Sequence, residues 1–269
     1  MNANHKVLIF TDLDGSLLDR DTFKFDKISK YIKDLISDGT IIIPNSSKTK
    51  VEIEKFNNDL DEDLPFVVEN GAAIYNLNLI NSSFPEKISL SREINEIIEI
   101  FDNKIPSKYK SKCKFIKDLK SDQQSEIFGL PKDKVKLAIN REYTIPLIFE
   151  GSKIQKTDLF KSVNNVGLSL QEGGRVINLC DKISKSKAMK NVVKIFKKIS
   201  KEKLITIGVG DNFNDLDMLK NCDVPCLVFN DQFKLDQINI DNLIFSNKPS
   251  PEGWADVIKM ALDKLNYSV

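Results

Sequence analysis

The sequence predicts an α/β protein with a doubly wound, mostly parallel sheet and a smaller α+β unit inserted in the chain. Short apolar segments alternate with amphipathic stretches at both ends of the sequence, as in βαβ units. The predicted strands are apolar throughout, which is typical of strands covered on both faces. The alternation breaks in the middle of the chain. We therefore expect a core domain of residues 1–82 and 184–269 and an inserted domain of residues 83–183.

The first part of the chain carries the alternation most clearly. A strand at Val7–Phe10 is followed by an amphipathic stretch, for which Asp26 is the expected N-cap. A second strand is predicted at Ile41–Ile43, and Thr49–Glu52 has the spacing of a capping box at the start of the next helix. A third strand is expected at Phe66–Val68, so this segment supplies three strands of the predicted sheet.

The inserted segment has a different rhythm, with lysine-rich and less regular sequence. Its predicted elements are, in order, a helix at Ile94–Phe101, strands at Lys134–Ile139 and Leu147–Phe149, a helix at Ile154–Val163 and a hairpin of Leu168–Leu170 and Val176–Leu179.

The βα alternation then returns. The predicted elements of this last part are a helix at Ala188–Phe196, strands at Leu204–Val209, Pro225–Phe229 and Leu243–Phe245, and a helix at Trp254–Leu265. Both ends of the chain therefore build one domain.

Composition and charge exclude several classes of protein. Among 269 residues, 41% are hydrophobic, and 40 basic against 39 acidic residues leave a formal net charge of +1. No overall field would recruit nucleic acid or a membrane, and no apolar run is long enough to span one. The N-terminal segment lacks the features of a secretory signal, so we expect a cytoplasmic protein, with an oligomeric state that the sequence leaves open.

Histidine and cysteine chemistry are also disfavoured. The single histidine, His5, is expected in a frayed N-terminal tail, which argues against a Ser-His-Asp triad and a histidine-rich zinc site. The four cysteines fit buried thiols better than a disulfide framework. Any catalysis should therefore depend on carboxylates and lysines.

Polar clusters follow three of the predicted strands at the edge where open parallel sheets bind ligands. These clusters contain Asp12 and Asp14, then Ser46 and Lys48, and finally Asp211, Asn214 and Asp215. If the strands are neighbours, the carboxylates meet within a few ångströms and cannot all ionise without a cation. Oxygen ligands alone select a hard ion, so we expect Mg²⁺.

Each motif alone has a simpler interpretation, as a turn or a helix cap. Their joint occurrence after buried strands favours a functional site. A dinucleotide-binding protein is one alternative, but Gly208-Val209-Gly210 lacks the third glycine of that fingerprint, and Asp211 and Asp215 would repel a pyrophosphate. A second alternative is a non-enzymatic phospho-acceptor like bacterial receiver modules, which needs neither Asp14 nor an inserted domain.

These motifs resemble those of the haloacid-dehalogenase-like phosphatases over nearly the whole chain. The resemblance lies in DLDGS at Asp12–Ser16, in Ser46, in a lysine within Ser184–Lys187 and in GDNFND at Gly210–Asp215. NSSKTKVE, VENGAAIY, NREYTIPLIF, EGGRVINL and PSPEGW look more specifically like the mannosyl-3-phosphoglycerate phosphatase subgroup, which carries an inserted α/β cap. Related sequences usually carry Gly where Ser186 stands, so Lys185 and Lys187 both remain candidates, with Lys185 favoured.

The resemblance implies specific roles. Asp12 would attack phosphorus to form an aspartyl phosphate, and Asp14 would act as general acid and then general base. Asp12, the backbone carbonyl of Asp14 and Asp211 would hold Mg²⁺, supported by Asn214 and Asp215. Ser46 and Lys185 would bind the phosphoryl oxygens, where their donors offset the charge of the transition state.

The resemblance to the subgroup also implies a substrate. The subgroup implies hydrolysis of mannosyl-3-phosphoglycerate to mannosylglycerate and phosphate. A mutase, or a phosphatase for glucosyl-3-phosphoglycerate, sucrose phosphate or another phosphorylated sugar, stays open, because the fold fixes the reaction and not the substrate. The substrate-binding candidates are Lys48, Arg141, Glu142, Gly174 and Arg175, since arginine offers a bidentate fork to a carboxylate.

Overall fold

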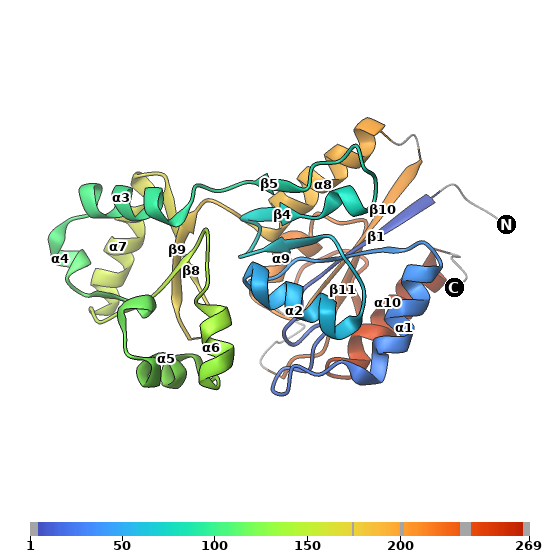
Figure 1. The fold of residues 1–269 in the computed structure, drawn as a ribbon, viewed down its shortest axis with the longest axis horizontal. Coiled ribbons are helices and arrows are strands. Elements are labelled where there is room, and N and C mark those ends of the chain that lie inside the picture. Colours follow the sequence, from blue (N-terminus) through green and yellow to red (C-terminus); the bar gives the residue numbers. More distant parts are fainter. Residues whose placement is uncertain (1–4, 174, 200–201, 232–237, 266–269) are drawn as a thin grey trace. The chain divides into compact units, whose positions relative to one another are not determined.

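The computed structural model describes residues 5–173, 175–199, 202–231 and 238–265 (Figure 1). Two compact units can be distinguished. The first contains Met1–Ser47, Phe56–Ile88 and Ser184–Val269, and the second contains Lys48–Lys55 and Ser89–Ile183. The assignment of these parts to a catalytic core and a cap stays a prediction, because compactness alone gives neither unit a role.

The first unit is built on a parallel sheet of five strands in the order β12-β11-β10-β1-β2. The strands are β1 (His5–Thr11), β2 (Ile41–Pro44), β10 (Lys203–Gly210), β11 (Val224–Leu227) and β12 (Ile244–Phe245). Val7–Phe10 of β1 are completely buried, as expected for a strand flanked by two others and covered by helices. The predicted doubly wound α/β fold is confirmed.

Four helices of the first unit pack against this sheet or against one another. They are α1 (Asp26–Ser37), α8 (Lys185–Ile199), α9 (Leu216–Leu219) and α10 (Glu252–Lys264). Helix α1 buries Ile28, Ile32 and Leu35, a spacing that keeps them on one helical face. It lies beside α10, and α8 lies beside α9 (Figure 1).

The capping box predicted at Thr49 and Glu52 is present, before α2 (Lys50–Leu60).

A second, three-stranded sheet of the first unit has the order β3-β4-β5. Its strands are β3 (Phe66–Val68), β4 (Ala73–Tyr75) and β5 (Lys87–Ser89), with a 3₁₀ turn at Leu77–Leu79 before β5. Strands β3 and β4 are antiparallel because Glu69, Asn70 and Gly71 all have positive φ and reverse the chain. The prediction that Phe66–Val68 joins the parallel sheet is therefore only partly right: a single parallel bridge links Val67 to Asn45.

The second unit contains an antiparallel sheet in the order β6-β7-β9-β8. Its strands are β6 (Cys113–Phe115), β7 (Ile145–Phe149), β8 (Leu168–Glu172) and β9 (Ile177–Asp181). Helices α3 (Ile94–Lys104) and α7 (Lys153–Asn165) bury their apolar faces in the same core as the strands. The remaining elements are α4 (Ser107–Lys110), the 3₁₀ turn Ile116–Asp118, α5 (Ser121–Phe128) and α6 (Lys132–Ala138).

Three local predictions are wrong. The segment predicted as a strand at Lys134–Ile139 is helix α6, because its buried residues are Val135 and Ala138, which share a helical face. Asp26 is the first residue of α1, and Phe25 occupies the N-cap position without a side-chain cap. His5 belongs to β1, where it pairs with Lys203, rather than to a frayed tail.

The helices can be judged by their length and apolar character. Within the described ranges, no helix is both long and apolar enough to cross a bilayer.

Candidate active site

The site lies at the carboxyl edge of the parallel sheet, where three neighbouring strands end. Asp12 follows β1, Ser46 lies two residues beyond β2, and Asp211 follows β10. Because β1 lies between β10 and β2, the three loops meet at one edge. The three strands are therefore neighbours in the sheet, as the sequence predicts.

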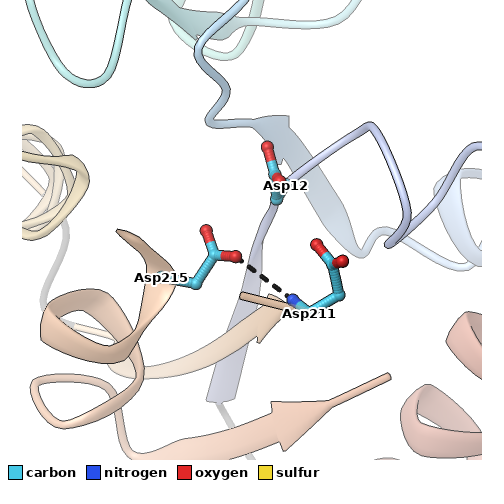
Figure 2. Close-up of side chains that lie close together, drawn as sticks. All are labelled: Asp12, Asp211 and Asp215. Atoms are coloured by element: carbon cyan, nitrogen blue, oxygen red, sulfur yellow. Dashed lines mark hydrogen bonds between the residues drawn. The ribbon is translucent and has the colours of Figure 1, made fainter. Parts of the chain in front are cut away.

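Three buried carboxylates form the centre of this edge. One oxygen each of Asp12, Asp211 and Asp215 lies within 4.8 Å of the others, and Figure 2 shows the three side chains turned toward a common space. Asp215 is completely buried, while Asp211 and Asp12 are 2% and 6% exposed. Three like charges so close together create a demand for positive charge.

The turn after β10 fixes two of these carboxylates relative to each other. Asp215 ends the 3₁₀ turn Phe213–Asp215, and its Oδ2 accepts a hydrogen bond from the backbone N–H of Asp211 at 3.1 Å (Figure 2). The same oxygen accepts from the backbone N–H of Asn212, also at 3.1 Å. A Cβ at Gly210 would lie 2.3 Å from the Cβ of Asp215, so only glycine allows this close approach. Asn214 is exposed on the same turn.

A buried ammonium group balances part of this charge. Lys185, the first residue of α8, is 2% exposed, and its Nζ lies 2.8 Å from Oδ1 of Asp12 and 2.7 Å from Oδ1 of Asp215. Burial alone would lower the pKa of this lysine, but the charges of the two carboxylates outweigh burial and raise it. Lys187 is exposed, so Lys185 is the lysine of this segment that meets the carboxylates.

The remaining carboxylate has its own set of donors. Asp211 pairs with the guanidinium of Arg20, its Oδ1 accepts from Ser16 Oγ at 3.2 Å, and its Oδ2 accepts from Asn230 Nδ2 at 3.1 Å. Burial, followed by the charges of Asp215 and Asp12, still raises the pKa of this carboxyl.

The pKa of Asp215 is raised in the same way. Burial raises the pKa of its carboxyl, and the ammonium of Lys185 offsets this only in part. The resident cations therefore leave the cluster of carboxylates short of positive charge. A hard divalent cation held by oxygen atoms would supply it, so the donor set of Asp12, Asp211 and Asp215 fits Mg²⁺.

Asp14 lies outside this carboxylate cluster, on a compact loop. Asp14 and Leu18 form a bridge, and the N–H of Gly15 donates to the carbonyl of Leu18 at 2.9 Å. Gly15 has φ of +80°, which lets the chain turn back toward the sheet. Asp14 as a residue is partly exposed, while the Oδ1 of its carboxylate is buried.

The loop after β2 carries Ser46, which is 1% exposed. Its neighbour Asn45 is completely buried and donates from Nδ2 to the backbone carbonyl of Lys185 at 3.0 Å. The N–H of Asn45 also donates to the carbonyl of Thr11 at 2.7 Å. Asn45 thus ties the ends of β1 and β2 to the start of α8, which carries Lys185.

The substrate-binding candidates belong to the second unit. Lys48 Nζ lies 3.4 Å from Glu52 Oε1, and the guanidinium of Arg141 donates to the Ala138 carbonyl and to Thr144 Oγ1. The backbone carbonyl of Glu142 accepts from the N–H of Ile94, and Arg175 is exposed. Gly174 lies outside the described residues. Arg141 is thus partly exposed and Arg175 is exposed.

Sequence reasoning missed several residues around the carboxylates. Arg20, Ser16 and Asn230 all contact Asp211, and Asn45 positions the start of α8. A signal existed for Asn45 and Ser16, because they stand within the motifs NSSKTKVE and DLDGS. Arg20 and Asn230 carried no local signal, because their roles depend on contacts far along the chain.

Comparison with known proteins identifies the family. Residues 9–239 match the family described as haloacid dehalogenase-like hydrolase. The chain therefore belongs to the haloacid dehalogenase-like hydrolases, and its family and curated relatives define it as a phosphoric monoester hydrolase.

Two curated relatives make the similarity more specific. One, from Persephonella marina, is named glucosyl-3-phosphoglycerate/mannosyl-3-phosphoglycerate phosphatase and is 31% identical over 268 residues, covering 96% of this chain and 98% of its own length. The other carries the same name, comes from Methanococcoides burtonii and is 30% identical over 280 residues, covering 97% and 99% of the two chains. The predicted resemblance to the haloacid-dehalogenase-like phosphatases, and to this subgroup, is confirmed.

Solved structures agree on the fold. A HAD/COF-like hydrolase from Plasmodium vivax superposes with a TM-score of 0.67 at 17% identity, covering 96% of this chain and 95% of that one. A sugar phosphatase of HAD subclass IIB superposes with a TM-score of 0.63 at 16% identity, covering 98% and 100%. At such identities the likeness shows the fold alone.

Proposed function

We propose that this protein hydrolyses glycosyl-3-phosphoglycerates, with mannosyl-3-phosphoglycerate the best substrate and the glucosyl compound also accepted. The observation that carries the proposal is the buried cluster of Asp12, Asp211 and Asp215 with Lys185, in a chain about 30% identical to phosphatases named for these substrates. Both relatives are named for the glucosyl and the mannosyl compound together, which supports a class of substrates rather than a single one.

In the proposed first step, a carboxylate oxygen of Asp12 attacks phosphorus. The new bond is Asp12 Oδ–P, the bond that breaks joins phosphorus to the oxygen on carbon 3 of the glycerate, and Asp14 gives its proton to that leaving oxygen. The contact of Lys185 Nζ with Asp12 Oδ1 at 2.8 Å would fix the carboxylate for this attack. Ser46 and Lys185 would donate to the phosphoryl oxygens as charge builds on them.

In the second step, water attacks phosphorus of the aspartyl phosphate. Asp14 takes a proton from this water, the Asp12 Oδ–P bond breaks, and phosphate leaves with Asp12 regenerated. Splitting one difficult displacement into two easier ones is the advantage of the covalent intermediate.

Asp12, Asp211 and the backbone carbonyl of Asp14 are the proposed Mg²⁺ ligands, with Asp215 and Asn214 in support. When bound, the ion would neutralise charge on the transferring phosphoryl group. Asn214 is exposed on its turn. The second unit is the proposed cap, in which Lys48, Arg141, Glu142, Gly174 and Arg175 are the candidates for substrate recognition.

A phosphate-release screen with Mg²⁺ tests the substrate. The panel contains mannosyl- and glucosyl-3-phosphoglycerate, 3-phosphoglycerate, sucrose 6-phosphate and mannose 6-phosphate. We expect the two glycosyl-phosphoglycerates to give the highest kcat/KM. A preference for a hexose phosphate or sucrose 6-phosphate would reject the proposed substrate and leave the family reaction in place.

A metal titration of the same reaction tests the cofactor. Chelation should stop phosphate release and Mg²⁺ should restore it. Ca²⁺ should bind without supporting turnover, because it accepts more oxygen ligands at longer distances and can engage both oxygens of Asp12. Full activity in chelator, or equal rates with Ca²⁺, would contradict the proposed metal site.

A further inference from the structure

Arg20 is a cation that the proposed mechanism does not use. Its guanidinium pairs with Asp211, one of the three buried carboxylates, although the two residues are 191 positions apart. The side chain of Arg20 is 39% exposed, whereas that of Asp211 is 3% exposed. One end of this ion pair therefore lies in the site and the other reaches solvent.

The contact is built into the loop after β1. A Cβ on Gly15 would lie 2.6 Å from Asp211 Oδ2 and 2.9 Å from Arg20 Nη2, so the backbone at Gly15 packs directly against the ion pair. Gly15 also has φ of +80°, which disfavours any other residue. Any larger residue at position 15 would collide with both partners, which distinguishes this pair from an ordinary surface contact.

The charges explain what this pair does. Lys185 contacts Asp12 and Asp215, and Arg20 is the cation paired with Asp211. Asp211 is held independently of Arg20, because Ser16 Oγ and Asn230 Nδ2 also donate to its carboxylate, at 3.2 and 3.1 Å. Loss of Arg20 would therefore remove a positive charge without releasing the side chain of Asp211.

We propose that Arg20 is a resident counter-cation of Asp211 that competes with the metal ion for this carboxylate and so lowers the affinity of the site. The inference rests on the proposed metal site. A guanidinium in contact with a metal ligand repels a divalent ion and occupies a lone pair that the ion needs. Because Arg20 is partly exposed, its side chain has solvent available when Mg²⁺ displaces it.

The test compares Mg²⁺ binding, measured by titration calorimetry without substrate, in four variants and the unchanged protein. Arg20→Gln and Arg20→Met remove the charge, Arg20→Lys keeps it, and Lys24→Gln removes an exposed charge from the same segment. We expect the two neutral Arg20 variants to bind Mg²⁺ roughly three- to tenfold more tightly. Arg20→Lys and Lys24→Gln should stay within about twofold of the unchanged protein.

Thermal unfolding in chelator gives a second readout. Without Arg20, Asp211 faces Asp12 and Asp215 with less positive charge nearby, so the metal-free Tm should fall by about 2–5 °C and Mg²⁺ should raise it more than in the unchanged protein. If Arg20 only positions Asp211, its removal would weaken Mg²⁺ binding instead. Unchanged or weaker affinity in both neutral variants overturns the proposal, while absence of Mg²⁺ binding in the unchanged protein overturns the metal site as well.

Discussion

The cations of the two units are held in different ways. In the first unit, Lys185 is 2% exposed and contacts two buried carboxylates, at 2.8 and 2.7 Å. In the second unit, Arg175 is exposed, and Arg141 uses its guanidinium for bonds to Ala138 and Thr144 in its own neighbourhood. In the proposed mechanism, the first arrangement is preorganised for charge that develops in the reaction. In the second, the guanidinium of Arg175 lies beside Gly129 and is not buried in a cluster of carboxylates.

In the proposed mechanism, the first unit carries out the reaction and the second recognises the substrate. Changes at the sheet edge should then act mainly on kcat, because those groups would touch the reacting atoms. Changes in the second unit should act mainly on KM, because those groups would contact remote parts of a substrate. Mutations of comparable size in the two units therefore test whether this difference holds.

The largest effect is expected for the proposed nucleophile. Asp12→Asn should lower phosphate release by about 10⁴-fold or more, because the amide cannot form the acyl phosphate. The fold should survive, since the change also relieves crowding with Asp211 and Asp215. Asp21→Asn, the same change at an exposed position of the same segment, serves as the control. Phosphate release above a trace in purified Asp12→Asn, with an unchanged melting curve, would remove Asp12 from its role.

Asp14→Asn should be impaired by about 10²–10⁴-fold, because positioned acid–base catalysis contributes that much. Rapid-quench measurement of phospho-enzyme separates the two steps. If both steps need Asp14, no intermediate accumulates. An intermediate that accumulates with a nearly normal rate of attack would restrict Asp14 to the hydrolysis of the aspartyl phosphate.

The next effect concerns stability and distinguishes the two lysines at the start of α8. Lys185→Gln should lower the free energy of unfolding by about 3–5 kcal/mol, because it leaves Asp12 and Asp215 buried without their shared cation. Lys187→Gln should change it by less than about 0.5 kcal/mol, since Lys187 is exposed. Denaturant titration without metal measures both. Equal losses in the two variants would mean that the buried ion pair contributes little.

The sequence predicts which polar residues gather at the sheet edge, because their positions are local features. Asp12, Ser46 and Asp211 follow apolar strands directly, and a parallel sheet brings the ends of neighbouring strands together whatever the rest of the chain does. Arg20 and Asn230 could not be predicted in this way. Their contacts with Asp211 arise from the paths of loops, which hydrophobic periodicity does not determine.

The wrong prediction of a strand at Lys134–Ile139, in the second unit, also has a physical cause. The alternation of Val135, Leu137 and Ile139 favoured a strand, but the side chains that are buried are Val135 and Ala138, one helical turn apart. A small residue such as alanine contributes little to a hydrophobic pattern, although it packs well in a helix. The hairpin of β8 and β9 was predictable because its strands flank a glycine-rich turn.

The smallest expected effect is a change in KM, and it tests how the substrate is recognised. Arg175→Ala should raise KM for a glycosyl-3-phosphoglycerate by roughly tenfold, about the value of one charge-assisted hydrogen bond to its carboxylate. The loss is modest because Arg175 is exposed in its own unit, so no buried charge is left without a partner. Arg141→Ala should also raise KM, but its bonds to Ala138 and Thr144 mean that unfolding must be measured beside kinetics.

A small phosphate ester without a carboxylate provides the internal reference, and Lys161→Ala removes another exposed cation of the second unit. With the small ester, KM should be unchanged in both arginine variants, because there is no carboxylate to bind. Lys161→Ala should leave KM unchanged for both substrates. If both arginine variants bind the glycosyl-phosphoglycerate normally, recognition of its carboxylate does not depend on these two side chains. The reaction at the sheet edge would be untouched by that result, because Asp12, Asp14 and Lys185 belong to the first unit.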